Sequence, residues 1–259
     1  SVGLGHRRLA IIDLSEAAAQ PMHSRDGRYV ITYNGEVDNY PELRRELERT
    51  GSRFTSQSDT EVILEAVICW GIDTAIKRFN GMFAFAVWDR KDRRLLLGRD
   101  RYGIKPLYVW QSRNQIAVAS EPKAFRSLQG FVHILDAEGL AEYFTFQNIL
   151  TNRTFLKDVS VFPPGNWASI SPADGALALT SYWDFDFHEP SEQASSREYA
   201  DELGRLLEQA VSRQLVSDVE VGSFLSGGLD SGSIAAIAAR YLPAIKTFTV
   251  GFELDSVTD

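Results

Sequence analysis

The sequence is poor in cysteine and contains no long hydrophobic run. Cys69 is the only cysteine among 259 residues, so an internal disulfide is excluded and a reducing cytoplasm is the expected compartment. No apolar stretch approaches the roughly 20 residues that a membrane-spanning helix needs. We also find no secretory signal at the start. These absences predict a cytoplasmic protein with no membrane partner.

Charge of one sign is not concentrated anywhere in the chain. There are 35 acidic and 27 basic residues, and no Lys/Arg cluster or basic amphipathic stretch stands out. Nucleic acids and membrane surfaces are therefore not expected as partners. The phosphate-binding motif of kinases and GTPases, GxxxxGKS or GxxxxGKT, is also missing.

Both ends of the chain are expected to be cut. Ser1 opens directly into the apolar stretch SVGLGHRRLAIIDL, which has the pattern of sequence from the middle of a domain. The final residues, GFELDSVTD, include no helix stop and no closing strand.

The first part of the chain has the pattern of an α+β domain, with strands paired by hairpins and a few helices. Strands are expected over Val30–Tyr33 (ending at an Asn-Gly turn signal), Met82–Trp88, Leu95–Gly98, Leu107–Trp110 and Ile116–Ala119. Helices are expected over Pro41–Thr50 and Asp59–Trp70.

The pattern changes after about residue 187, where a polar, Pro-containing stretch is typical of a linker. An amphipathic helix is expected over Arg197–Val216. Strand Val221–Leu225, a Gly-rich loop, helix Ser233–Tyr241 and strand Lys246–Phe252 then form one βαβ unit of a parallel sheet. We therefore expect a first domain over 1–186, a linker over 187–196 and a second domain beginning at 197.

The Gly-rich loop is the sharpest signal, because it follows an apolar strand and opens a helix. The glycines allow a tight turn, and the helix N-terminus suits an anion such as pyrophosphate. Asp230 would repel phosphate directly but fits if Mg²⁺ lies between them. A Gly-rich turn without a ligand is the alternative. The residues of this loop are Ser226, Gly227, Gly228, Leu229, Asp230 and Ser231.

The hexamer SGGLDS resembles the PP-loop, SGGxDS, of ATP pyrophosphatases, which activate a carboxylate by splitting ATP into AMP and pyrophosphate. The resemblance implies ATP and Mg²⁺ as cofactors, and it implies that Leu225 and Val250 line the adenine pocket.

The first part resembles the class II glutamine amidotransferase domain, an N-terminal-nucleophile hydrolase fold in which stacked antiparallel sheets lie between helices. Together with SGGLDS, the whole chain is similar to glutamine-hydrolysing asparagine synthetases. The motifs that carry this resemblance are HRRLAIIDLS (6–15), YNGEVDNY (33–40), SQSDTEVIL (56–64), FNGMFAFAVWD (79–89), GRDRYGIKPLY (98–108), ASEPKAF (119–125) and FPPGNW (162–167).

The resemblance implies a glutamine pocket whose residue types suit their roles. Arg8 would bind the α-carboxylate and Asp59 the α-ammonium group. The Asn34 amide and the Gly35 N–H would form the oxyanion hole, with Gly35 needed because a Cβ would crowd the substrate. Glu36 would support the loop or contact the substrate. Taken singly, Arg8 also fits a surface ion pair, Asn34-Gly35 a simple turn, and Asp59 a helix N-cap.

The nucleophile of the family is a Cys at the mature N-terminus, and this sequence begins after it. Neither Ser1 nor Cys69 is expected to replace it, since the helix pattern places Cys69 in the core. The chain by itself is therefore expected to be inactive.

The leading hypothesis for the parent protein is ATP-dependent amidation of aspartate through an acyl-adenylate, with ammonia from glutamine. A related enzyme that amidates another carboxylate, such as a sugar acid, is the runner-up, and a β-lactam synthetase-like enzyme or a non-enzymatic scaffold follows. The acceptor, and whether the full-length protein is a homodimer, stay open.

Overall fold

The computed structural model describes residues 1–171, 175–187 and 194–251. Contacts between Cα atoms divide them into two compact units. Unit 1 comprises Ser1–Leu9 and Ser15–Asp186, and unit 2 comprises Ala10–Leu14 and the described residues from Phe187 onward. The short segment Ala10–Leu14 thus belongs with unit 2 although it lies near the start of the chain.

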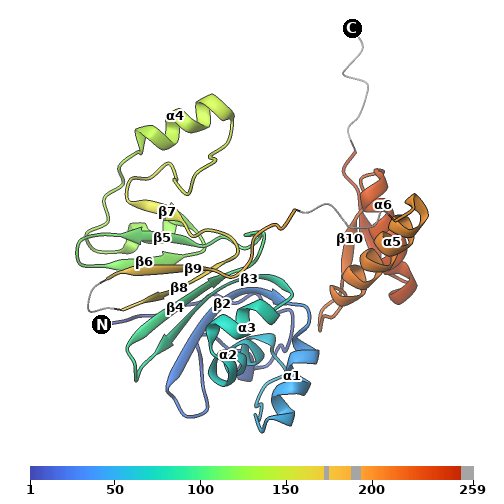
Figure 1. The fold of residues 1–259 in the computed structure, drawn as a ribbon, viewed down its shortest axis with the longest axis horizontal. Coiled ribbons are helices and arrows are strands. Elements are labelled where there is room, and N and C mark those ends of the chain that lie inside the picture. Colours follow the sequence, from blue (N-terminus) through green and yellow to red (C-terminus); the bar gives the residue numbers. More distant parts are fainter. Residues whose placement is uncertain (172–174, 188–193, 252–259) are drawn as a thin grey trace. The chain divides into compact units, whose positions relative to one another are not determined.

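Two antiparallel sheets form the centre of unit 1 (Figure 1). The larger has six strands in the order β1-β2-β3-β4-β8-β9, and the smaller has three in the order β6-β5-β7. The strands of the larger sheet are β1 (Met22–His23), β2 (Tyr29–Val37), β3 (Gly81–Asp89), β4 (Arg94–Arg99), β8 (Asn166–Ile170) and β9 (Leu177–Ser181). Those of the smaller are β5 (Tyr108–Gln111), β6 (Ile116–Ala119) and β7 (Val159–Val161).

Helices cover one face of the larger sheet, where α1, α2 and α3 lie together (Figure 1). The outer face of the smaller sheet packs against the 3₁₀ helix η2 through Trp110 and Phe125. The helices of unit 1 are η1 (Glu16–Ala18), α1 (Tyr40–Arg49), α2 (Asp59–Trp70), α3 (Ile72–Arg78), η2 (Pro122–Ser127) and α4 (Ala137–Phe146).

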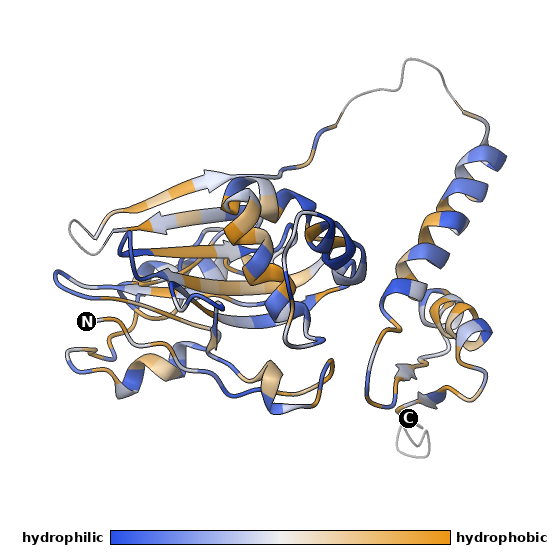
Figure 2. Ribbon diagram, turned by 90° about the horizontal axis from the view of Figure 1, so that it is seen from below, coloured by the Kyte–Doolittle hydropathy of each residue, from blue (hydrophilic) through white to orange (hydrophobic). Residues whose placement is uncertain are grey.

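Strand β3 shows why the layers stack in this way. Phe83, Phe85 and Val87 alternate with Ala84 and Ala86, so successive side chains point to opposite faces. The large residues join the core under the helices, whereas the two alanines join the core between the sheets. Apolar stretches accordingly concentrate in the strands of unit 1 in Figure 2.

Unit 2 contains α5 (Ser196–Arg213), β10 (Gly222–Phe224), α6 (Leu229–Tyr241) and β11 (Lys246–Phe248). β10 and β11 are parallel, with Gly222 opposite Lys246, and α6 connects them. The predicted βαβ unit is therefore confirmed. Among the described residues, no helix has both the length and the apolar character required to cross a bilayer.

The predicted hairpins β3–β4 and β5–β6 and the helices near Pro41–Thr50 and Asp59–Trp70 are confirmed. The turn expected at Asn34-Gly35 is wrong, because β2 continues through both residues to Val37.

Several boundaries in unit 2 also differ from the prediction. Helix α5 ends at Arg213 rather than Val216, since the chain then turns so that the N–H of Asp218 donates to the carbonyl of Ile11. Helix α6 begins at Leu229 rather than Ser233, with Gly228 as its N-cap. Strand β11 ends at Phe248, and residue 252 lies outside the described residues.

Candidate functional site

The candidate site in unit 1 is built on the edge of β2. β1 pairs with β2 only as far as Ile31, so within the described residues the following half of β2 has a strand partner only on the β3 side. The N–H groups of Tyr33 and Val37 donate away from β3, to the side chains of Gln20 (2.7 Å) and Asp59 (3.2 Å). Because N–H directions alternate along a strand, the N–H of Gly35 is expected to face the same edge.

Gly35 has a backbone conformation that other residues rarely adopt, with φ of 151°. A Cβ added there would lie 2.1 Å from the carbonyl oxygen of Met82 and 2.7 Å from the Cα of Phe83, both in β3. The neighbouring strand is therefore a steric reason for glycine that the sequence did not indicate. The expected crowding of a substrate by a Cβ at position 35 stays a prediction.

Asp59 is a buried carboxylate at the start of α2. It accepts hydrogen bonds from the hydroxyl of Tyr33 (2.7 Å) and the N–H of Val37. It is the first helical residue and not the N-cap; Ser58 holds that position and accepts from the N–H of Thr60. Burial raises the pKa of Asp59, while the Tyr33 and Val37 hydrogen bonds and the charge of Arg8 act in the opposite direction.

Glu36 adds a second carboxyl group to this region. Burial raises the pKa of Glu36 to about 7, with further contributions from the negative charges of Asp38 and Asp59. The positive charge of Lys105 lowers it. A ligand with an ammonium group would relieve the repulsion among these carboxylates.

Arg8 lies in the irregular segment that enters unit 1. Two contacts attach this segment to β2: His6 Nδ1 lies 3.3 Å from Thr32 Oγ1, and that hydroxyl donates to the carbonyl of Gly5. Burial lowers the pKa of His6, and the positive charge of Arg8 lowers it further. The charge of Arg8 also opposes the rise that burial causes in the pKa of Asp59. The charge of Asp59 is thus coupled to that of Arg8 and to that of Glu36. That the three side chains converge on one pocket stays a prediction.

Asn34 points toward the end of β6. Its Nδ2 donates to the hydroxyl of Ser120 at 3.2 Å. This contact leaves the second amide hydrogen of Asn34 for a ligand. Ser120 belongs to the ASEPKAF motif, but its contact with Asn34 has no signature in the sequence.

A buried carboxylate organises the loop that carries Lys105. Asp100 is 1% exposed and accepts from the N–H groups of Phe83, Tyr102, Ile104 and Lys105. No role was predicted from the sequence for Gln20, Tyr33 or Asp100. The sequence feature that could have identified two of them is their place in a motif: Tyr33 directly precedes Asn34, and Asp100 lies within GRDRYGIKPLY.

The second candidate site is the loop between β10 and α6. The hydroxyls of Ser226 and Ser231 lie 2.9 Å apart, and the N–H of Ser226 donates to Ser231 Oγ at 3.1 Å. Gly227 has φ of 84°, which favours glycine. Gly228 caps α6 without a side-chain hydrogen bond, so the first-turn N–H groups remain suited to an anion.

The remaining predicted residues of this site flank the loop. Asp230 lies in the first turn of α6. The N–H of Leu225 donates to the carbonyl of Phe248, and Thr249 Oγ1 donates to the carbonyl of Leu225. Val250 follows β11 and is 82% exposed. No group of three or more metal-ligating His, Cys, Asp or Glu side chains occurs in the described part of the chain.

The prediction that Cys69 lies in the core is wrong, because its side chain is exposed. The buried face of α2 includes Val62, Ile63, Ala66 and Val67, whereas Cys69 stands one turn after the half-buried Glu65 on the other face.

Comparison with known proteins decides the family. The family model for the glutamine amidotransferase domain matches residues 1–183. The chain belongs to the glutamine amidotransferase family. A second family model, asparagine synthase, matches residues 202–259 of the chain.

The relatives of this chain agree with both family matches. It is 40% identical to asparagine synthetase [glutamine-hydrolyzing] 1 of Bacillus subtilis over 97% of its length, which is 39% of that protein. It is 37% identical to a putative asparagine synthetase [glutamine-hydrolyzing] of Mycobacterium bovis, covering 100% of this chain and 41% of the relative. The chain thus spans less than half the length of these relatives.

A solved structure supports the fold. The glutamine phosphoribosylpyrophosphate amidotransferase of B. subtilis, in complex with ADP and GMP, matches with a TM-score of 0.50 and 20% identity over 94% of this chain and 50% of that one. The predicted N-terminal-nucleophile hydrolase-like α+β sandwich is confirmed.

Proposed function

We propose that unit 1 binds glutamine through Arg8, Asn34, Gly35, Glu36 and Asp59. The observation that carries this proposal is the buried Asp59 carboxylate, which Tyr33 and Val37 hold beside Glu36 and within the field of Arg8. An amino acid supplies the matching charges, with its ammonium group toward the carboxylates and its carboxylate toward Arg8. The Asn34 amide and the Gly35 N–H would hold the oxyanion that forms at the side-chain carbonyl.

Isothermal titration of the chain with glutamine tests this proposal. We expect binding that Asp59→Asn weakens by at least about tenfold, because a charge-assisted contact is lost. Arg49→Gln, a change on the exposed end of α1, serves as the control and should bind like the parent. Equal affinity of Asp59→Asn and the parent would contradict the glutamine pocket.

The second part of the proposal concerns ATP. Ser226, Gly227, Gly228 and Ser231 would hold the pyrophosphate, and Asp230 would contact Mg²⁺ that bridges to it. Leu225 and Val250 would contact the adenine. The clustered serine hydroxyls and the helix N-terminus without a side-chain cap support this assignment. Titration with Mg²⁺ and pyrophosphate should show binding that Ser231→Ala weakens and that Ser212→Ala, a change within α5, leaves unchanged.

For the whole parent protein, we propose ATP-dependent amidation of aspartate with ammonia from glutamine. The names of the two relatives and the asparagine synthase match support aspartate over other acceptor carboxylates. Domain boundaries of 1–186, 187–196 and 197–259 are part of the proposal, as is a cytoplasmic location. The family matches and the division near residue 186 support these boundaries.

A further inference from the structure

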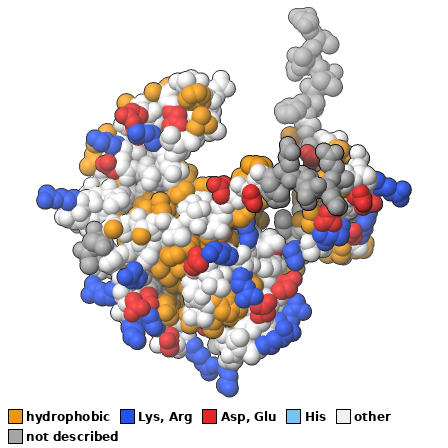
Figure 3. Space-filling view, viewed as in Figure 1, with side chains coloured by type: hydrophobic (Ala, Val, Ile, Leu, Met, Phe, Trp, Pro, Cys, Tyr) orange, Lys and Arg blue, Asp and Glu red, His pale blue; other side chains and the backbone are white. Residues whose placement is uncertain are grey.

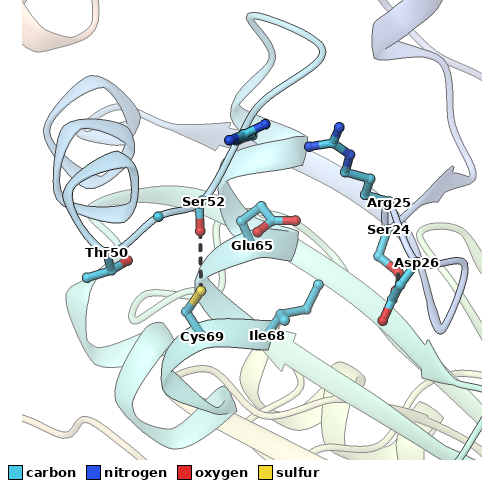
Figure 4. Close-up of a pocket in the computed structure, with 10 residues that line it drawn as sticks. Ser24, Arg25, Asp26, Thr50, Ser52, Glu65, Ile68 and Cys69 are labelled. Atoms are coloured by element: carbon cyan, nitrogen blue, oxygen red, sulfur yellow. Dashed lines mark hydrogen bonds between the residues drawn. The ribbon is translucent and has the colours of Figure 1, made fainter.

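The outer face of α2 carries a pocket that contains none of the residues proposed for glutamine (Figure 4). It is an open hollow of the surface with a volume of about 620 Å³, large enough for a small ligand that stays partly exposed to solvent. Three segments form it: the turn 24–26 between β1 and β2, residues 50–53 after α1, and one face of α2 with Glu65, Ile68 and Cys69.

Two arginines give this pocket its capacity for an anion. Arg25 and Arg53 are both exposed. Among the described residues neither forms an ion pair or a hydrogen bond, and the charge of Arg25 acts on Glu65 across the pocket. Figure 4 shows the Arg25 side chain extending over the pocket. A guanidinium group is a planar donor fork that matches a carboxylate, so two of them on one rim favour a carboxylate ligand.

The two acidic side chains of the pocket, Asp26 and Glu65, differ in how well each could bind a ligand. The Asp26 carboxylate already accepts from Ser24 Oγ (2.6 Å) and from the N–H of Arg28 (3.0 Å), so it stabilises its own turn. Glu65 is half-buried on α2, and burial raises its pKa while a hydrogen bond with Ser52 lowers it. Glu65 lies on the face of α2 that lines the pocket, and its hydrogen-bonding partner, Ser52, is itself a lining residue, so Glu65 is the acidic group that a ligand in the pocket would meet.

We propose that this pocket is an accessory site for a free α-amino acid, with Arg25 and Arg53 binding the carboxylate and Glu65 accepting from the ammonium group. A simple anion would be repelled by Glu65, and a simple cation by the two arginines. A zwitterion complements both charges. The site is independent of the glutamine pocket proposed above.

Cys69 provides a local reporter for this site. It is the only cysteine of the chain, and its Sγ lies 3.3 Å from the hydroxyl of Ser52 at the pocket (Figure 4). Iodoacetamide alkylates it when the thiolate sulfur attacks the methylene carbon and iodide leaves. A ligand in the pocket would cover the thiol and slow this reaction, whereas a ligand elsewhere would not.

The experiment measures the alkylation rate of Cys69 by mass spectrometry in the presence of each of the common amino acids except cysteine, whose thiol would itself consume the reagent. The Arg8→Ala variant is used throughout, so that the proposed glutamine pocket is disabled. We expect at least one amino acid to slow alkylation in a saturable way, by about tenfold at ten times its Kd. Its amide, which lacks the carboxylate, and its N-acetyl derivative, which lacks the ammonium group, should give no protection.

Variants complete the test. Arg25→Gln/Arg53→Gln should abolish the protection, and Glu65→Gln should weaken it, whereas the control Arg49→Gln should retain it. Circular dichroism establishes that each variant is folded. The proposal is overturned if no amino acid protects Cys69 at millimolar concentrations, if the double arginine variant is protected equally, or if the N-acetyl derivative protects as well as the amino acid.

Discussion

A single added carbon atom, the Cβ, determines why position 35 must be glycine. Gly35 and Gly81 have the unusual φ values of 151° and 156° within paired strands. A Cβ on either would lie 2.1 Å from a carbonyl oxygen of the opposite strand, Met82 for Gly35 and Glu36 for Gly81. The two glycines therefore allow β2 and β3 to approach at the point where the candidate oxyanion donors lie.

Gly35→Ala is expected to destabilise unit 1 by about 3 kcal/mol or more, because it combines backbone strain with a backbone collision. Denaturant unfolding followed by tryptophan fluorescence measures this loss. Gly3→Ala is the matched control, since nothing lies within 4 Å of its added Cβ. Equal stability of the two variants would show that β2 and β3 separate at little cost.

Glu36 is expected to make stability depend on pH. Its pKa of about 7 in the folded protein exceeds the ordinary 4.5, so the folded state binds a proton more tightly than the unfolded state does. The free energy of unfolding should therefore fall as pH rises from about 4.5 to 7, and the loss should be complete above 7. Glu36→Gln removes the effect and should be more stable than the parent at pH 8 by about 1–2 kcal/mol, allowing for solvent screening.

Unfolding curves at pH 4 and pH 8 measure this difference. At pH 4 the variant and the parent should unfold alike, because Glu36 is protonated in both states. Glu16→Gln, an exposed change on η1, is the control. A Glu36→Gln variant that gains nothing at pH 8 would mean that the carboxylate is well solvated.

Ser120 is expected to act as a positioning residue for Asn34. Ser120→Ala removes the acceptor at 3.2 Å and frees the amide to rotate, so glutamine should bind roughly fivefold more weakly, the equivalent of one ordinary hydrogen bond. Ser120→Thr retains the hydroxyl and should restore affinity. Titration measures the affinity, and thermal unfolding should show little change in either variant. Weakened binding that Thr does not restore would contradict a positioning role.

At the scale of elements, local pattern predicted most of the fold. The alternation in MFAFAVW and the polar turn after it predict the β3–β4 hairpin, and the glycines between two apolar runs predict the β10–α6–β11 unit. What local pattern could not supply is long-range pairing. Asn-Gly in β2 has the local pattern of a turn, but nine residues of ladder with β3 outweigh that preference.

The same limit applies to the site. Arg8, Asn34 and Asp59 were found through family resemblance, whereas the contacts of Ser120 and Gln20 span 86 and 13 positions and have no local signature. The prediction for Cys69 is wrong because Cys69 lies on the face of α2 that carries Glu65, away from the buried stripe that contains Val62 and Ala66. An apolar residue type near a buried stripe does not by itself place a side chain on that stripe.

Helix α5 offers a prediction at this scale. Ser195 and Glu198 form a reciprocal capping box, in which Ser195 N donates to Glu198 Oε2 at 2.7 Å and Glu198 N donates to Ser195 Oγ at 3.3 Å. Ser195→Ala should lower stability by about 1 kcal/mol. Ser212→Ala, inside the same helix, should be neutral or slightly stabilising because alanine favours helix. Denaturation followed by far-UV circular dichroism compares them, and the opposite order would contradict the capping role.

At the scale of the whole molecule, the two compact units are not continuous stretches of the chain. Ala10–Leu14 belongs to unit 2, while the residues before and after it belong to unit 1. On the face shown in Figure 3, acidic and basic side chains are interspersed. All five tryptophans lie in unit 1, at positions 70, 88, 110, 167 and 183. Tryptophan fluorescence therefore reports unit 1, whereas far-UV circular dichroism reports the helices of both units.

Because the two signals report different units, they can test which unit holds the segment Ala10–Leu14. Asp218 binds it twice: Asp218 Oδ2 accepts from the N–H of Asp13 at 2.7 Å, and the N–H of Asp218 donates to the carbonyl of Ile11 at 3.0 Å. Asp218→Ala removes the first bond, which is charge-assisted but exposed, and should destabilise unit 2 by about 1 kcal/mol. The unfolding of unit 2, which circular dichroism detects and fluorescence does not, should occur at a lower denaturant concentration. The midpoint of the fluorescence transition, which reports unit 1, should not change. Asp201→Ala, on the exposed surface of α5, should move neither. If Asp218→Ala instead shifts the fluorescence transition, the segment stabilises unit 1, and its assignment to unit 2 is wrong.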